Sequence, residues 1–355
     1  MSEERKTLLE VKDLRVSFFT PAGEVKAVDG ISYTLKENEV MGVVGESGSG
    51  KSVEAYSIMG LLQNPGKVVG GSITFDGEDI LSYDEEQMRN FRGNKVSMIF
   101  QNPMTCLNPV YTIGNQLMEA ITCHDKDYPK EKARARAIEM LDLVGINNAE
   151  KRVDQYPHEF SGGMRQRAMI AMALICEPKL LIADEPTTAL DVTIQAQILD
   201  LMKSLQKKEN TAIIFITHNL GVVAEMCDRV SVMYAGKIVE QGTDEDIFYR
   251  PAHPYTMGLL ESMPRLDAEE HERLIPIEGT PVDLLNPPKG CNFAPRCSHC
   301  MKVCLAEKPP YADLGDGHVS ACWLHFMGKK AEALQNDTKA AGTQGVSQEE
   351  RQEDR

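Results

Sequence analysis

Apolar residues follow a strand pattern through most of the first hundred residues. Residues 8–20 alternate apolar and polar positions, are rich in β-branched and aromatic side chains, and are followed by a similar segment at 24–35. A continuous apolar run at 40–44 is typical of a buried strand, and shorter strands are predicted at 70–77 and 96–100. The chain is therefore expected to begin with a β-rich region.

From about residue 102 to 178 the strand pattern gives way to a helical one. Ser161 is placed to cap a helix that runs to Leu174. A helical stripe of apolar residues lies within 131–144 and consists of Ala133, Ala137, Ile138, Leu141 and Val144. Apolar strands return at 180–183 and 212–217, and a helix with Ile194, Ile198, Leu201 and Leu205 on one face separates them. The pattern predicts an α/β fold with a helical insertion.

Composition narrows the class of protein. The 355 residues exceed one average domain, and 42% apolar with 26% charged residues is ordinary for a globular protein. A net charge of −15 repels a phosphate backbone, so no nucleic-acid partner is expected. No apolar run approaches the roughly 20 residues of a membrane span, and no signal core follows the first residues. A cytoplasmic location without disulfides is expected.

One glycine-rich run directly after the strand at 40–44 fits G-x-x-x-x-G-K-[ST] at every fixed position. The run is Gly45, Glu46, Ser47, Gly48, Ser49, Gly50, Lys51 and Ser52. The glycines let the chain bend tightly and turn N–H groups toward a phosphate at the start of a helix. Lys51 is predicted to reach the β- and γ-phosphates, and the Ser52 hydroxyl is predicted to coordinate Mg²⁺.

Four polar side chains stand where apolar strands end, which is where ligands bind in parallel sheets. Gln101 follows the strand at 96–100, Asp184 and Glu185 follow 180–183, and His218 follows 212–217. Asp184 is predicted to hold the Mg²⁺ sphere, and Glu185 to orient the attacking water or accept its proton. A neutral His218 imidazole suits a bridge between γ-phosphate and water. Each of these residues alone is also compatible with a solvated strand end.

The glycine pair after Ser161 predicts a second anion site. Ser161, Gly162 and Gly163 begin a capped helix, whose free N–H groups favour negative charge. One chain thus has a single phosphate loop but two phosphate-binding helix starts.

Taken in order, these motifs resemble the ATP-binding subunits of ABC transporters over about residues 8–250. The resemblance implies an ABC ATPase cassette with a mixed-sheet core, an antiparallel β subdomain and a helical subdomain. It makes Gln101 the Q-loop glutamine and a further Mg²⁺ ligand, 161–163 the signature, Asp184-Glu185 the end of Walker B, and His218 the switch histidine. Asp191 looks like the D-loop aspartate, and Phe18 occupies the adenine-stacking position, with Phe19 the alternative. The resemblance also implies head-to-tail pairing, in which each signature closes over the ATP of the other cassette.

A narrower resemblance covers the region after residue 235. The segments 234–242, 253–256 and 264–266 resemble the oligopeptide and dipeptide importer branch, especially the D-type ATP-binding subunits of oligopeptide permeases. Such subunits imply a heterodimer with a second ATPase, two transmembrane permease subunits and an extracytoplasmic peptide-binding protein. The expected location is the cytoplasmic face of the inner membrane, as a peripheral protein. The segment after Gln101, including 102–104 and 107–109, is the predicted permease contact.

Five cysteines cluster near the end of the chain, at positions 291, 297, 300, 304 and 322. Such clustering in a cytoplasmic protein predicts a metal site, and either tetrahedral zinc or a [4Fe-4S] cluster fits four thiolates. Reduced thiols without metal are the remaining alternative. The family resemblance favours a [4Fe-4S] cluster on Cys291, Cys297, Cys304 and Cys322, with Cys300 as the substitute.

The expected domain plan is a cassette at 1–250, whose helical subdomain lies at about 102–178, and a cysteine-rich metal-binding extension at 251–327. Prolines at 251–288 predict an extended connector within this extension, and the polar residues 328–355 predict a disordered tail. Two other functions fit less well: a soluble ABC ATPase of translation or DNA repair, which usually has two cassettes or a coiled coil, and a metal or redox sensor.

Overall fold

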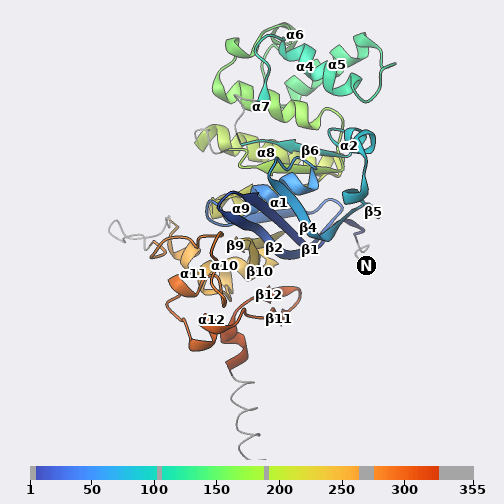
Figure 1. Cartoon of the computed structure of the whole chain (residues 1–355). Coiled ribbons are helices and arrows are strands. Elements are labelled where there is room, and N and C mark those ends of the chain that lie inside the picture. Colours follow the sequence, from blue (N-terminus) through green and yellow to red (C-terminus); the bar gives the residue numbers. More distant parts are fainter. Residues whose placement is uncertain (1–4, 102–105, 188–191, 264–275, 328–355) are drawn as a thin grey trace, which may run out of the picture.

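The structure, a computed structural model, describes residues 5–101, 106–187, 192–263 and 276–327. Two sheets and their covering helices form the middle of an elongated molecule (Figure 1). A group of helices, α4 to α7, lies at one end, and the carboxyl-terminal strands β11 and β12 lie toward the other.

The first sheet is antiparallel and holds the predicted amino-terminal strands. Its order is β2-β1-β4-β5, with bounds Gly23–Lys36, Thr7–Thr20, Gly66–Phe75 and Glu78–Asp79. Alternate side chains of β1, such as Leu9, Val11 and Val16, are buried because they face the second sheet across a shared core. The strand at 70–77 was predicted too short, since β4 begins at Gly66.

The second sheet is mixed, as the sequence predicts. Its order is β11-β12-β10-β9-β3-β8-β7-β6. The bounds are Ala312–Gly315, His318–Ser320, Lys237–Thr243, Arg229–Tyr234, Val40–Val44, Ala212–Thr217, Leu180–Asp184 and Val96–Ile99, in that order. The strands from β9 to β6 are parallel. The carboxyl ends of β3, β6, β7 and β8 therefore meet at one edge.

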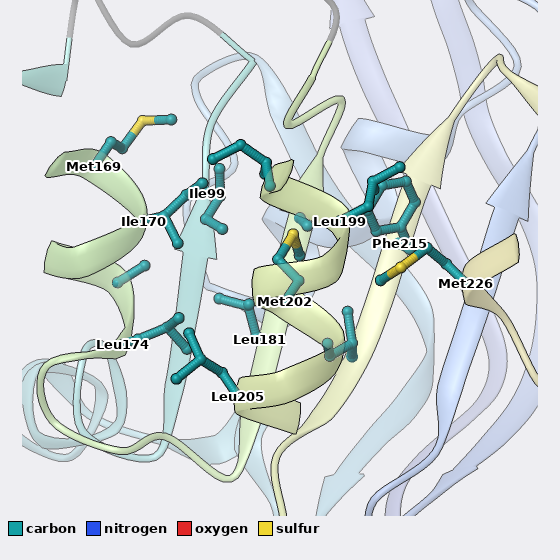
Figure 2. Packing of buried hydrophobic residues seen from close by; sticks show 14 of the residues in the cluster. Ile99, Met169, Ile170, Leu174, Leu181, Leu199, Met202, Leu205, Phe215 and Met226 are labelled. Carbon is teal, nitrogen blue, oxygen red and sulfur yellow. The ribbon is translucent and has the colours of Figure 1, made fainter. Parts of the chain in front are cut away.

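Helices cover the parallel strands and build the main core. α7 (Gly162–Leu174) and α8 (Val192–Glu209) place Ile170, Leu174 and Met202 against the sheet (Figure 2). They meet side chains of β6, β7 and β8, among them Leu181 and Phe215, which are fully buried. α1 (Lys51–Ile58) and α9 (Leu220–Met226) complete the cover, while α2 (Glu85–Phe91) lies beside the first sheet.

The described residues between β6 and β7 contain helices and no strand. α4 (Ile113–Thr122), α5 (Lys130–Leu143) and α6 (Ala149–Arg152) pack with α7 at the end of the molecule. The apolar stripe of α5 faces inward, and Ala133, Ala137 and Leu141 are fully buried. Among the described residues, none of the helices combines the length and the apolar character needed to cross a bilayer.

The carboxyl-terminal region continues the second sheet, because β12 pairs with β10. α10 (Asp244–Tyr249), α11 (Pro254–Glu261) and α12 (Lys302–Ala306) lie around it. The prediction of an extended connector throughout 251–288 was wrong for α11. Pro254 occupies the first turn of that helix, where a missing N–H costs nothing, and the His253 side chain caps it.

Candidate nucleotide-binding site

The glycine-rich loop joins β3 to α1 in a bend that only glycine fits at two positions. Gly45 has φ 154°, and a Cβ there would lie 2.2 Å from the Met233 carbonyl oxygen. Gly50 has φ 104°, and its Cβ would lie 2.5 Å from the Ala27 carbonyl oxygen. Gly48, by contrast, also has a positive φ but faces open space. The bend is thus packed tightly at its two ends and open at its middle glycine.

Lys51 begins α1 and turns its ammonium group into the loop. Its Nζ donates to the carbonyl oxygens of Gly45 at 2.8 Å and Glu46 at 2.9 Å, and lies 3.4 Å from Ser49 Oγ. Burial lowers the pKa of Lys51, while the nearby carboxylates of Glu185 and Asp184 oppose that change. A cation held inside a ring of backbone groups suits an anionic phosphate ligand.

Ser52 and Asp184 join the loop to the end of β7. Ser52 Oγ donates to Asp184 Oδ1 at 3.1 Å, and the Asp184 side chain is almost fully buried. Burial raises the pKa of Asp184, and the bond from Ser52 opposes this rise. A hydroxyl and a carboxylate side by side are hard oxygen ligands of the kind that Mg²⁺ prefers.

Glu185 connects the ends of three strands. Its Oε2 accepts from Gln101 Nε2 at 2.8 Å, and its Oε1 lies 3.1 Å from His218 Nδ1. Gln101 follows β6, Glu185 follows β7 and His218 follows β8, so the parallel register brings all three together. Glu185 has φ 48°, a left-handed conformation that is unusual for a non-glycine residue and is often found at functional sites.

The signature segment lies at the start of α7 and forms the predicted cap. Ser161 Oγ accepts from the Met164 N–H at 3.3 Å, and a Cβ on Gly162 would meet nothing within 4 Å. The buried Gln166 of α7 donates to the carbonyl oxygen of Pro186, just after Glu185. In the described part of the chain, no hydrogen bond joins 161–163 to the phosphate loop of the same molecule.

The structure says less about two other predicted nucleotide-binding residues, Phe18 and Asp191. Phe18 lies in β1 with its ring directly against Gly66, where a Cβ would be 2.7 Å from Phe18 Cε1, whereas Phe19 is 49% exposed. Asp191 lies outside the described residues, as do 102–104 of the predicted permease contact and the tail 328–355.

Sequence reasoning missed a partner of the loop that comes from the far end of the chain. Glu46 is an ion-pair partner of Arg296, and its N–H donates to the Tyr255 hydroxyl at 2.9 Å. Glu46 occupies a variable position of the motif, so the linear pattern carries no signal for this contact.

The four cysteines favoured as ligands line one cavity. Cys291, Cys297, Cys304 and Cys322 surround it, whereas Cys300 is exposed and lies outside its lining. Burial raises the pKa of Cys291 and of Cys322 to about 11. Within the described ranges, no three His, Cys, Asp or Glu side chains are arranged to hold a metal ion. The sulfur donors are thus gathered, but they do not form a ligand set as they stand.

Comparisons with known proteins agree on one family. A family model described as "ABC transporter" matches residues 28–188, and one described as "Oligopeptide/dipeptide transporter, C-terminal region" matches 239–304. The oligopeptide transport ATP-binding protein OppD of Bacillus subtilis is 58% identical over 89% of this chain and 88% of its own length. The dipeptide transport ATP-binding protein DppD of the same organism is 54% identical over 94% and 99%.

Solved structures agree as well. A dimeric ATP-binding cassette in a post-hydrolysis state with ADP and Pi has a TM-score of 0.61 at 25% identity, covering 66% of this chain and 98% of that one. CbiO1 from Clostridium perfringens has a TM-score of 0.60 at 29% identity, covering 70% and 92%. With this similarity in sequence and fold, the chain belongs to the ABC transporter family and has the C-terminal region of its oligopeptide/dipeptide transporters.

Proposed function

We propose that this protein is the ATP-hydrolysing subunit of an importer for oligopeptides or dipeptides. The observation that carries the proposal is the cluster of Gln101, Glu185 and His218 beside the Ser52–Asp184 pair and the phosphate loop. Relatives that share more than half of their residues with the chain are named for oligopeptide and dipeptide transport.

We assign the residues as follows for ATP as substrate. The loop from Gly45 to Ser52 surrounds the β-phosphate, and Lys51 neutralises charge on the β- and γ-phosphates. Ser52, Asp184 and Gln101 hold Mg²⁺, which supplies charge neutralisation when bound. Glu185 orients water and accepts its proton, His218 orients Glu185, and Phe18 stacks on adenine. Asp191, the proposed D-loop residue, lies outside the described residues.

The signature supports a dimeric active unit. Ser161 and Gly162 are exposed, a Cβ on Gly162 would meet nothing within 4 Å, and no hydrogen bond among the described residues joins 161–163 to the phosphate loop of the same chain. We therefore propose that they complete the ATP site of a homologous ATPase subunit, in a heterodimer. The solved cassette with ADP and Pi is itself dimeric.

We propose two transmembrane permease subunits and an extracytoplasmic peptide-binding protein as the other partners. The chain would then lie on the cytoplasmic face of the inner membrane as a peripheral protein. A large groove beside Gln101 supports this arrangement. Its lining includes Leu81, Tyr83, Met88, Cys106 and Met172. The predicted contact at 107–109 follows Cys106 directly.

Transport in a defined system tests the proposal. The chain is assembled with its second ATPase, permeases and binding protein in lipid vesicles, and ATP hydrolysis and peptide uptake are measured together. Both activities should depend on this chain and fall to background with Lys51→Ala. Uptake that continues at the normal rate with Lys51→Ala would contradict the proposal.

A finer proposal concerns the cysteines: Cys291, Cys297, Cys304 and Cys322 bind a [4Fe-4S] cluster, with zinc as the alternative. Their shared cavity supports it. Protein purified without oxygen should contain iron and acid-labile sulfide. Cys304→Ser should lose both, and Cys300→Ser should keep both. Zinc alone would select the alternative, and metal-free protein would refute the proposal.

A further inference from the structure

The carboxyl-terminal region contacts the phosphate loop at Glu46. Arg296 Nη1 lies 2.5 Å from Glu46 Oε2, and Nη2 lies 3.0 Å from Oε1, so the pair is bidentate. The two residues are 250 positions apart, and the Arg296 side chain is only 3% exposed. Bidentate arginine–carboxylate pairs fix orientation as well as distance.

Arg296 is itself held rigidly. Its Nε donates to the Glu278 carbonyl oxygen at 3.0 Å, Nη2 donates to the Ile277 carbonyl oxygen at 3.2 Å, and the guanidinium lies over the Tyr234 ring. Arg296 ends a short 3-10 turn, η3 (Ala294–Arg296), and is followed at once by Cys297. The guanidinium is therefore held by the segment that precedes the cysteines and by Tyr234 of β9.

A second contact fixes the backbone of the same loop residue. The Glu46 N–H donates to the hydroxyl of Tyr255, which is fully buried in α11 and packs against Tyr234 and Phe293. Glu46 is thus held at its side chain and at its main chain by residues that follow the cassette motifs in sequence.

The position of Glu46 also affects Lys51, because the Lys51 ammonium group donates to the carbonyl oxygen of Glu46. A shift of Glu46 would move one of the groups that hold this cation. A buried ion pair contributes little net stability on average, but it does restrict geometry. The contact is therefore better suited to positioning the loop than to stabilising the fold.

We infer that Arg296 is a positioning residue for ATP binding, through which the carboxyl-terminal region sets the conformation of the phosphate loop. This inference rests on the proposed function. It assigns no contact with ATP to Arg296, which acts through Glu46.

Nucleotide affinity of the full-length chain tests the inference. Binding of a fluorescent ATP analogue is measured for the unaltered protein, Arg296→Ala, Glu46→Ala and the double variant, together with thermal unfolding. Each single variant should weaken binding by at least about fivefold, and the double variant should be no weaker than the worse single one. Arg296→Lys, which keeps the charge without the bidentate fork, should show a smaller loss.

Lys308→Ala is the matched control. Lys308 also links the carboxyl-terminal region to the cassette, by an ion pair with Asp29 at 2.8 Å, but it does not contact the loop. This variant should bind the analogue normally. If Arg296→Ala does not fold, Arg296→Lys and Glu46→Gln decide the question.

Two results separate the inference from the proposed function. Normal affinity in the Arg296 and Glu46 variants, with only a lower unfolding temperature, would overturn the inference and leave the proposed function intact. Failure of the unaltered protein to bind the analogue would overturn both.

Discussion

Gly162 is the first residue of α7 and belongs to the signature segment 161–163. It has no positive φ, and an added methyl group would meet no atom within 4 Å. The fold therefore does not require glycine there, whereas an approaching phosphate would.

Gly162→Ala should leave the unfolding temperature unchanged or slightly raised and reduce ATP hydrolysis by about 10²-fold. The added methyl group would separate the signature from the ATP of the second subunit. Steady-state hydrolysis by the assembled pair, with thermal unfolding of the single chain, checks this expectation. Full activity would show that no ligand approaches Gly162 closely.

Glu54 lies in α1 directly behind the phosphate loop and is fully buried, with a hydrogen bond from the Tyr33 hydroxyl. Burial raises the pKa of Glu54 to about 7, and the bond from Tyr33 opposes this rise. The folded protein therefore holds this proton more tightly than the unfolded chain does. Its contribution to stability is complete below the unfolded value of about 4.5 and is lost as pH rises through 7.

Glu54→Gln should remove this dependence, because the amide does not ionise. Thermal unfolding between pH 5 and pH 8 measures it. The unaltered protein should lose about 1–3 kcal/mol relative to Glu54→Gln over this range. Parallel pH profiles for the two proteins would show that folding does not raise the pKa of Glu54.

Among the elements, the parallel strands determine where the residues of the candidate site lie. β6, β7 and β8 run parallel and side by side. The residues that follow these strands therefore lie close together, although they are far apart in the sequence. The apolar runs are local and continuous, and this is why the strands at 40–44 and 212–217 could be predicted with their observed bounds.

Packing under α7 and α8 should carry much of the stability. Leu181 of β7 is 1% exposed in the main core. Leu181→Ala should lower the free energy of unfolding by about 2–5 kcal/mol, because it leaves a cavity. The control is Leu305→Ala, since Leu305 is 63% exposed and should change stability by less than about 0.5 kcal/mol. Urea unfolding compares the two, and equal effects would contradict the described packing.

At the scale of the whole molecule, contacts between segments far apart in sequence are the features that the sequence could not predict. Pro254 was expected in an extended connector because proline breaks helices, but its place in the first turn removes the penalty. The pairing of β12 with β10 and the Arg296–Glu46 contact join segments far apart in sequence. Neither follows a local period or a motif, so neither could be predicted from residue patterns.

The groove beside Gln101, which we propose as part of the permease contact, allows hydrolysis and transport to be tested separately. Leu81 lies in its lining and is 38% exposed, so a charged side chain fits there without disturbing the core. Leu81→Glu should lower peptide uptake about tenfold and leave ATP hydrolysis by the ATPase pair unchanged, since it would remove apolar area from the proposed permease contact. Leu305→Glu, on the exposed helix α12, should change neither. Normal uptake with Leu81→Glu would place the permease contact elsewhere.

The most direct test of the account is hydrolysis in Glu185→Gln. We propose that Glu185 accepts the proton and that other residues bind ATP. A glutamine at this position still offers an amide oxygen and an amide N–H toward Gln101 and His218. In a single-turnover measurement with the second ATPase, this variant should bind ATP as tightly as the unaltered chain and form a stable dimer. Hydrolysis at its site should fall by about 10²-fold or more. Hydrolysis at the normal rate would contradict the account.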